Sequence, residues 1–391
     1  MEQKESKKTV RTFAIASFFN DMGSDMIYPI WPVFVTGVLK ANMTVLGFID
    51  GLGEALVSIS QAVSGYLSDR IRKRKAFIWT GYLFGSISRV GYAFSTMWQW
   101  LVPFRILDRA GKIRNAPRDA MIADMSAKEE LGKNFGLLRT MDYLGAVVGI
   151  IICVLFINYL GYRKLFLIAA IPSLISVLLV IFVIKDYFPA VKNETQTAGK
   201  KRISFEAVDK NLWLYIIASS IFALGSFSYS FLLVCAKTHG CKAVFIPVLY
   251  LIFTMVASIV SLPFGKLSDR VGRKPVIIAS YILWILACVS FIFFSRGGII
   301  VIAFVLYGLH RGALEPVQKA FVSQLSVPEH RASILGGFQL AVGMCALPAS
   351  LVAGIIWDRV GVTAVFCFAA VTTIISIVLI TFVKEKKAEV Q

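Results

Sequence analysis

Long apolar stretches recur along the whole chain and are separated by short polar segments. A helix needs about 20 mostly apolar residues to cross the hydrocarbon core of a membrane, which is about 30 Å thick. The pattern therefore predicts an all-α membrane protein with twelve transmembrane helices. The predicted spans cover residues 12–38, 43–68, 76–96, 97–122, 134–159, 164–184, 211–236, 243–267, 275–295, 297–322, 332–357 and 361–383.

The span over 97–122 is the least apolar of the twelve. It is accepted as a span because the parity and the spacing of its neighbours require a crossing here, and its basic end is expected to emerge into water. Its charged residues are Arg105, Asp108, Arg109, Lys112, Arg114, Arg118 and Asp119.

A polar segment after the sixth span divides the chain. We expect an N-terminal six-helix bundle over residues 1–185, a cytoplasmic linker over 186–210 and a C-terminal six-helix bundle over 211–391.

Composition narrows the class of protein further. Of 391 residues, 57% are hydrophobic and only 16% are charged, against about 25% charged in ordinary soluble domains. This composition excludes a disordered protein, a secreted disulfide scaffold and an ordinary cytosolic enzyme. The net charge of +18 is spread among hydrophobic spans rather than gathered on one soluble face, so we expect no nucleic-acid partner.

The basic residues sort by side of the membrane. With the N-terminus inside, runs such as residues 70–75 (RIRKRK) and 200–202 (KKR) fall on the inner side, and the outer loops contain only scattered bases. Cytoplasmic loops carry such an excess of Lys and Arg. The protein is therefore expected in the plasma membrane, or the inner membrane of a prokaryote, with both termini cytoplasmic.

The sequence also repeats internally. Residues 65–70 (GYLSDR) reappear 200 positions later as residues 265–270 (GKLSDR). Since the period equals six spans and a linker, both halves have the same orientation, and the two bundles are expected to be related by a pseudo-two-fold axis along the membrane normal.

These residues resemble a known family. The repeated loop is similar to the loop signature of the major facilitator superfamily, and Met22-Gly23-x5-Pro29-x2-Pro32 is similar to a second signature in the first helix of its transporters. Ser88-Arg89, with the segment over 108–120, resembles a prokaryotic branch of this family. The resemblance covers essentially the whole chain and implies two six-helix bundles that transport solutes by alternating access.

The loop signature carries a predicted conformational latch. Its glycines lack a Cβ, so a neighbouring helix can approach closely, and its aspartates can meet a positive helix N-terminus. The resemblance implies that this contact holds the halves in the outward-facing state; the alternative is a charge cluster that sets topology. The latch residues are Gly65, Asp69, Arg70, Gly265, Asp269 and Arg270.

Three departures from the family pattern affect the interpretation. Arg72 stands where the loop has Gly, and Arg109 stands where the pattern of the fourth helix has Gly. Gly145-x3-Gly149 lacks the Gly-Pro pair of many drug antiporters, which weakens a drug-export function.

Ionisable side chains at membrane depth are costly, so each is a functional hypothesis. Asp25 is the first candidate for proton coupling, followed by Asp21 and Glu54, with Arg105 as a partner. Static ion pairs that fix helix packing are the alternative. Candidate substrate-binding residues are Arg89, which is also a possible partner of these acids, Tyr28, Tyr229, Arg311 and Glu315.

Together these features predict a monomeric secondary active transporter, surrounded by membrane lipid, that moves a small organic solute by alternating access coupled to protons. The alternatives are an uncoupled facilitator or a lipid flippase. A membrane enzyme or sensor is disfavoured because no nucleophile–base pair, metal site, cofactor motif or signalling domain is recognisable.

Overall fold

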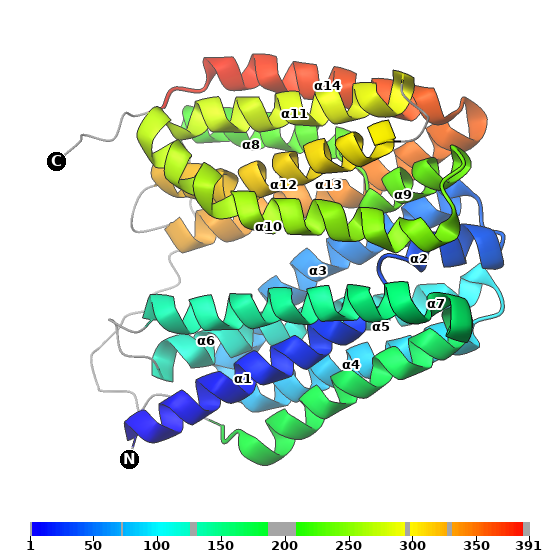
Figure 1. Cartoon of the computed structure of the whole chain (residues 1–391). Coiled ribbons are helices and arrows are strands. Elements are labelled where there is room, and N and C mark those ends of the chain that lie inside the picture. Colours follow the sequence, from blue (N-terminus) through cyan, green and yellow to red (C-terminus); the bar gives the residue numbers. More distant parts are fainter. Residues whose placement is uncertain are drawn as a thin grey trace. The chain divides into compact units, whose positions relative to one another are not determined.

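The computed structural model describes residues 2–71, 73–125, 131–186, 209–293, 298–326 and 331–385, and these residues contain helices and no strand (Figure 1). The predicted fold class is therefore confirmed. The helices gather into two compact units: unit 1 comprises Met1–Ala41 and Leu52–Glu194, and unit 2 comprises Asn42–Gly51 and Thr195–Gln391.

The first four predicted spans are all helical, and two of them are interrupted. The first consists of α1 (Glu2–Asp25), the short α2 (Trp31–Val33) and a π-helical turn η1 (Phe34–Val38). The second and third are α3 (Met43–Ile71) and α4 (Arg74–Phe94). The fourth is α5 (Trp98–Ala110), the 3₁₀ turn η2 (Gly111–Arg114) and α6 (Asn115–Met125).

The fifth and sixth spans form one element, α7 (Leu131–Val183), which is broken at Gly161. Gly161 has φ of 67°, a left-handed conformation that glycine adopts without steric cost. The break separates two helices, as the sequence predicts.

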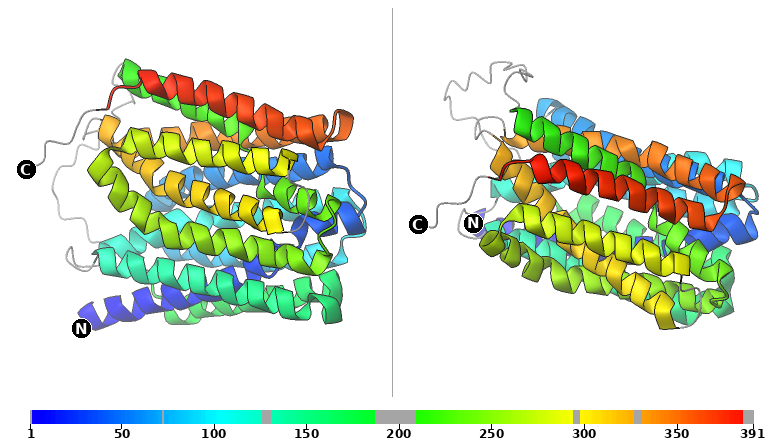
Figure 2. Two further views of the ribbon diagram at one scale, coloured as in Figure 1. Left: turned by 45° about the horizontal axis from the view of Figure 1, so that its top comes forward. Right: turned by 90° about the horizontal axis from the view of Figure 1, so that it is seen from above.

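The later spans are α8 (Lys210–Gly225) with α9 (Tyr229–Thr238), then α10 (Ile246–Val271), α11 (Arg273–Phe293), α12 (Gly298–Leu325), α13 (Arg331–Arg359) and α14 (Val362–Phe382). A short 3₁₀ turn, η5 (Ala243–Phe245), precedes α10. Within unit 2, α8 packs against α13 and α14, and α11 lies beside α14 in every view (Figures 1 and 2).

Eight helical stretches in the described part of the chain are long and apolar enough to cross a membrane. The spans of α1, α4 and α5–α6 are not among them, and these helices carry buried polar or charged side chains. The buried polar and charged side chains of these helices find partners inside unit 1. A helix can therefore be buried in the unit although its hydropathy is low.

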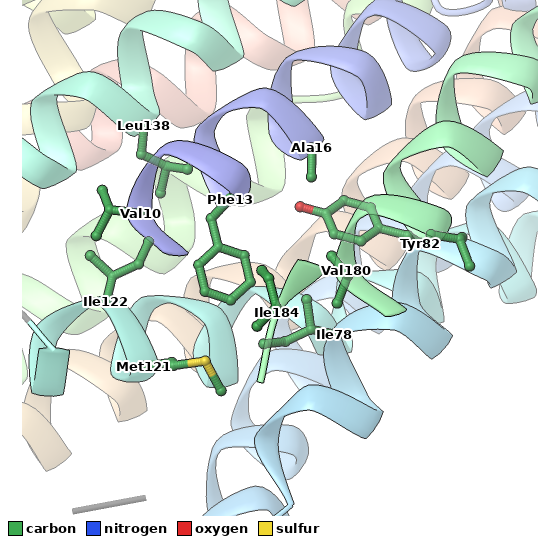
Figure 3. Close-up of a cluster of buried hydrophobic side chains, with 11 residues drawn as sticks. Val10, Phe13, Ala16, Ile78, Tyr82, Met121, Ile122, Leu138, Val180 and Ile184 are labelled. Carbon is green, nitrogen blue, oxygen red and sulfur yellow. The ribbon is translucent and has the colours of Figure 1, made fainter. Parts of the chain in front are cut away.

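An apolar cluster joins α1, α4, α6 and α7 at one end of unit 1 (Figure 3). Phe13 of α1 and Tyr82 of α4 are fully buried in it, with Leu138 and Val180 from the two halves of α7. Packing in this cluster holds the four elements against one another. Several polar residues of the candidate site lie on the same elements.

The two halves repeat a detail of helix capping. Asp186, just after α7, accepts a hydrogen bond from the Lys75 backbone N–H at the start of α4 (3.2 Å). Glu385, after α14, accepts in the same way from the backbone N–H groups of Arg273 and Lys274 at the start of α11 (2.5 and 3.1 Å). A carboxylate is favourable at a helix N-terminus in both cases.

The domain limits predicted from the sequence remain a prediction. One feature has no counterpart in them: α3 is a continuous helix whose first residues, 42–51, belong to unit 2 and whose remainder belongs to unit 1.

Candidate functional site

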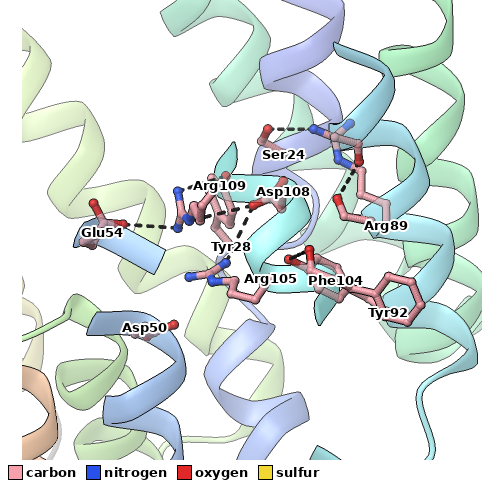
Figure 4. A network of polar contacts seen from close by, with 12 residues as sticks. Ser24, Tyr28, Asp50, Glu54, Arg89, Tyr92, Phe104, Arg105, Asp108 and Arg109 are labelled. Atoms are coloured by element: carbon pink, nitrogen blue, oxygen red, sulfur yellow. Dashed lines mark hydrogen bonds and ion pairs between the residues drawn. The ribbon is translucent and has the colours of Figure 1, made fainter. Parts of the chain in front are cut away.

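The centre of unit 1 contains a chain of four charged side chains. Arg105, Asp108 and Arg109 lie within one turn or so of α5, a spacing that places them on adjoining parts of the helix surface. Glu54 reaches them from α3 (Figure 4).

The four side chains are linked in sequence. Glu54 Oε1 lies 3.2 Å from Arg109 Nη2, and Arg109 Nε lies 3.8 Å from Asp108 Oδ2. The same Asp108 oxygen lies 4.0 Å from Arg105 Nη1. Asp108 therefore sits between two guanidinium groups, and Glu54 ends the chain; below, we call these four residues the charge chain.

Aromatic rings from the first span support both arginines. The Arg105 guanidinium lies over the Trp31 ring at 4.6 Å from its centroid, and that of Arg109 lies over the Tyr28 ring at 5.1 Å. The Tyr28 hydroxyl also accepts a hydrogen bond from Arg109 Nη1 at 3.5 Å. Cation–π contacts strengthen when water is excluded, as it is here.

Burial differs sharply along the charge chain. The side chains of Arg105, Arg109 and Asp108 are 2%, 8% and 9% exposed, whereas that of Glu54 is 50% exposed. The Glu54 carboxylate is open on one side, while the other three charges are enclosed. Glu54 is thus the accessible end of the charge chain.

Arg89 is a separate case. Its guanidinium donates hydrogen bonds to Ser24 Oγ (2.8 Å), Ala169 O (3.0 Å), Asn20 O (3.2 Å) and the Ser173 hydroxyl, all neutral acceptors. The expected pairing of Arg89 with a membrane-embedded acid is therefore wrong for this structure. Neutral oxygens from α1 and α7 satisfy the charge instead, and they leave Arg89 2% exposed.

The basic end of the fourth span also differs from expectation. Arg114 and Arg118 are 4% exposed rather than immersed in water. Arg114 donates to Gly111 O (2.8 Å), and Arg118 donates to the Ser17 hydroxyl (2.8 Å) and pairs with Asp119 (2.9 Å). Backbone and side-chain oxygens thus replace water around these guanidiniums.

The acids of the first helix lie near this region. Asp25 is buried and is the last residue of α1, where the helix gives way to turns before α2. Asp21 is half-buried and accepts a hydrogen bond from Asn20 Nδ2 at 2.9 Å. Both keep their place as candidate proton carriers.

Two contacts are described for the candidate residues of unit 2. Arg311 and Glu315 pair with each other along α12 (2.5 Å) and are both exposed. Tyr229, at the start of α9, packs its ring against Tyr250 with centroids 5.2 Å apart. Their proposed role in substrate binding stays a prediction.

Only part of the predicted latch lies among the described side chains. Asp269 pairs with Arg273 within its own loop (3.8 Å), and Arg270 is exposed. The side chain of Asp69 and residue 72 lie outside the described residues; Arg70 is exposed.

The close helix approach expected at the latch glycines stays a prediction. A Cβ at Gly65 would make an ordinary 3.5 Å contact with Ala116 Cβ, and one at Gly265 would meet nothing within 4 Å in the described part of the chain. Both glycines therefore have space around them among the described residues.

Sequence reasoning missed Asp50, which lies one turn before Glu54 on α3 and is 1% exposed. Its carboxylate accepts hydrogen bonds from the hydroxyls of Ser228 (2.8 Å) and Ser230. The available signal was its i, i+4 spacing from Glu54 within an apolar span.

Comparison with known proteins agrees with this architecture. The family model described as Major Facilitator Superfamily matches residues 13–262 and 245–391. An uncharacterized MFS-type transporter of Methanocaldococcus jannaschii is 37% identical over 389 residues, which cover 97% of this chain and 96% of the relative. The multi-drug resistance efflux pump PmrA of Streptococcus pneumoniae is 26% identical over 336 residues, 82% of each chain.

Solved structures of transporters share the fold. The nucleoside transporter NupG superposes with a TM-score of 0.75 at 17% identity, over 95% of this chain and 97% of that one. A bacterial homologue of the human lysosomal transporter Spinster, in an inward-facing conformation, gives a TM-score of 0.72 at 14% identity over 97% and 95%. The chain is thus a multi-pass membrane transporter rather than an enzyme, and it belongs to the major facilitator superfamily.

Proposed function

We propose that the protein is a secondary active transporter that moves a small organic anion or zwitterion across the plasma membrane by alternating access, coupled to protons. The observation that carries the proposal is the charge chain, in which two buried guanidiniums share one enclosed carboxylate and one accessible carboxylate. Both termini are placed in the cytoplasm on the distribution of Lys and Arg between the loops.

Charge balance explains how such a site selects its solute. With Glu54 ionised, the two arginines are matched by Asp108 and Glu54, and the charge chain is neutral. When Glu54 binds a proton it releases Arg109, and the charge chain gains one positive charge. An anionic group then restores neutrality in an enclosed site where unbalanced charge is expensive.

The replacement of Glu54 by an anionic group of the solute links the movement of the proton to the movement of the solute. A carboxylate or phosphate of the solute takes the place of Glu54 on Arg109, since a guanidinium binds either group through paired N–H donors. Proton and anion therefore load together and leave together. Asp25, buried at the end of α1, is the second candidate for the proton.

An uncoupled facilitator or a flippase is the rival function. Either would move solute in proteoliposomes at a rate independent of a pH gradient. A thermal-shift screen of the purified protein against organic anions and zwitterions, with organic cations as controls, supplies the solute for this measurement.

We expect Glu54→Gln to abolish pH-gradient-driven accumulation while solute exchange without a gradient continues. Glutamine keeps the shape of the side chain but cannot bind and release a proton. Asp25→Asn is measured in parallel, and loss of gradient dependence in one variant alone identifies the proton carrier. Undiminished accumulation in both variants would refute proton coupling through these carboxylates.

A further inference from the structure

Lys112 is a basic residue of the fourth span that does not belong to the charge chain. It lies in the 3₁₀ turn η2, two residues after the end of α5 at Ala110, and it is half-buried. Its ammonium group makes no hydrogen bond or ion pair with any residue that the structure describes. A positive charge that is partly removed from water and has no partner favours the binding of an anion.

The surroundings of Lys112 do not neutralise it. The charges that act on it most strongly come from two basic and two acidic residues, Arg114, Asp21, Arg109 and Asp108. These four charges cancel one another, so the ammonium group of Lys112 is the excess positive charge of the group. An anionic group bound there would restore neutrality.

The 3₁₀ turn decides which side chains Lys112 can meet. In a continuous α-helix, Lys112 would be able to pair with Asp108, which lies four residues before it. A 3₁₀ helix has about 3.0 residues per turn instead of about 3.6, so the tighter winding turns Lys112 away from Asp108 and toward the line of Arg109. Asp108 accordingly lies between Arg105 (4.0 Å) and Arg109 (3.8 Å), and Lys112 follows Arg109 along the chain without an acid of its own.

A contact between two glycines holds this turn against α4. A Cβ at Gly81 would lie 2.5 Å from Gly111 O, and one at Gly111 would lie 2.7 Å from Gly81 O. Arg114, the last residue of η2, donates a hydrogen bond to Gly111 O (2.8 Å) and places its guanidinium over the Tyr82 ring, 4.9 Å from the centroid. Both ends of the turn are therefore fixed, and Lys112 lies between them.

Unit 2 lacks this turn. α4 and α11 have the same length and begin 199 residues apart, and by this offset Gly81 and Gly111 correspond to Ser280 and His310. The Ser280 hydroxyl lies 2.9 Å from His310 Nδ1, and α12 runs as a single α-helix from Gly298 to Leu325. A hydrogen-bonded pair of side chains thus replaces the contact between glycine backbones.

The counterpart of Lys112 in unit 2 is neutralised. By the same offset Lys112 corresponds to Arg311, which pairs with Glu315 one turn along α12 at 2.5 Å. In unit 1 the position of Glu315 is taken by Ala116, which cannot form this pair. The repeat therefore keeps a basic residue at this position in both units but leaves it without an acid in unit 1.

We infer that Lys112 is a second anion contact beside the charge chain and that the solute carries two anionic groups. The inference rests on the proposed function, in which one anionic group of the solute takes the place of Glu54 on Arg109. Lys112 lies three residues further along, a rise of about 5 Å, so a second anionic group on a short solute binds its ammonium. Dicarboxylates and phosphorylated organic acids have two such groups, and monocarboxylic acids have one.

Pairs of acids that differ by one anionic group test the inference on the purified full-length protein. The probes are glutarate with pentanoate, and 2-phosphoglycolate with glycolate, and apparent Kd values come from the concentration dependence of thermal unfolding. In the native protein we expect the probe with two anionic groups to bind about tenfold more tightly than its partner in at least one pair, the scale of one hydrogen bond between charged groups. The pair that shows this preference distinguishes a dicarboxylate from a phosphorylated acid.

Lys112→Gln is expected to abolish the preference, so that both acids of a pair bind with the Kd of the single acid in the native protein. Lys112→Arg keeps the positive charge and is expected to retain the preference. Lys319→Gln is the matched control, because Lys319 is an exposed lysine of α12, and this variant should bind all four probes as the native protein does.

An unchanged preference in Lys112→Gln overturns the inference. An equal weakening of both acids of a pair in this variant also overturns it, because this indicates a general effect on the fold. If the native protein binds the single acids as tightly as their partners, only the role of Lys112 fails and the proposed transport of an anion stands. If the native protein binds none of the four probes, both fail.

Discussion

Replacing Arg109 by glutamine is expected to abolish transport and to lower the free energy of unfolding by about 3–5 kcal/mol, the usual effect of removing one partner of a buried ion pair. Arg109 lies between Glu54 (3.2 Å) and Asp108 (3.8 Å) and rests on the Tyr28 ring. Without it, the enclosed carboxylate of Asp108 keeps only the more distant Arg105 in the charge chain (4.0 Å), and the solute loses its guanidinium. Transport in proteoliposomes and denaturant unfolding in detergent measure the two effects.

Arg139→Gln provides the matched control. Arg139 also pairs with an aspartate, Asp142, at 3.4 Å; the Arg139 side chain is 64% exposed and that of Asp142 is 12% exposed. A pair whose guanidinium stays in water contributes about 0–1 kcal/mol, so this variant should lose less stability than Arg109→Gln. Equal loss of stability in the two variants would contradict the role given to burial at Arg109.

A double-mutant cycle separates the contribution of Glu54. If Glu54 serves only as the accessible end of the charge chain, Glu54→Gln should change stability little by itself, and its coupling to Arg109→Gln should be about 1 kcal/mol. A coupling several times larger would mean that Glu54 is a structural partner and not the exchangeable one.

Hydropathy and length dictate the positions of most of the spans. The spans of α1, α4 and α5–α6 are the informative cases. Their hydropathy is low, and the even number of crossings identified the fourth span where hydropathy did not. The break at Gly161 falls between two predicted spans, where a turn was required.

The charge partners could not be predicted in the same way. Arg89 is stabilised by Asn20 and Ser24 on α1 and by Ala169 and Ser173 on α7, residues far away in the sequence. A backbone carbonyl or a serine hydroxyl gives no signal in a sequence comparable to that of an acid. A search for opposite charges at equal depth therefore gave Arg89 the wrong class of partner.

Asp50 was missed for a related reason. Its donors, Ser228 and Ser230, lie about 180 positions away in the sequence. The discontinuity at residues 226–228, which makes these hydroxyls converge on one carboxylate, is a tertiary feature. The local sequence shows the carboxylate of Asp50 but not the serine hydroxyls that donate hydrogen bonds to it.

The pair Gly145-x3-Gly149 takes on a different meaning in the structure. In the sequence it is notable only for lacking a following proline. In unit 1 both glycines face α1: a Cβ at Gly145 would lie 3.0 Å from the carbonyl carbon of Phe18, and one at Gly149 would lie 3.0 Å from that of Met22. Two sites four residues apart on each helix thus bring the backbones of α1 and α7 into contact, which is the geometry of a small-xxx-small interface.

Gly149→Ala is therefore expected to destabilise the protein by about 1–3 kcal/mol, and Gly145→Ala/Gly149→Ala by more, through overpacking. The added Cβ would also overlap the carbonyl oxygens of Met22 and, in the double variant, Phe18, and a backbone cannot rotate away as a side chain can. Thermal unfolding of the purified protein measures the loss.

Gly336→Ala on α13 is the control for helix propensity. A Cβ there meets nothing within 4 Å among the described residues, so alanine should leave stability unchanged or raise it by about 0.5–1 kcal/mol. If Gly149→Ala behaves like Gly336→Ala, the contact between α1 and α7 is looser than the structure has it. If it is destabilised as expected, the close contact of α1 with α7 at Met22, between Asp21 and Asp25, contributes to stability.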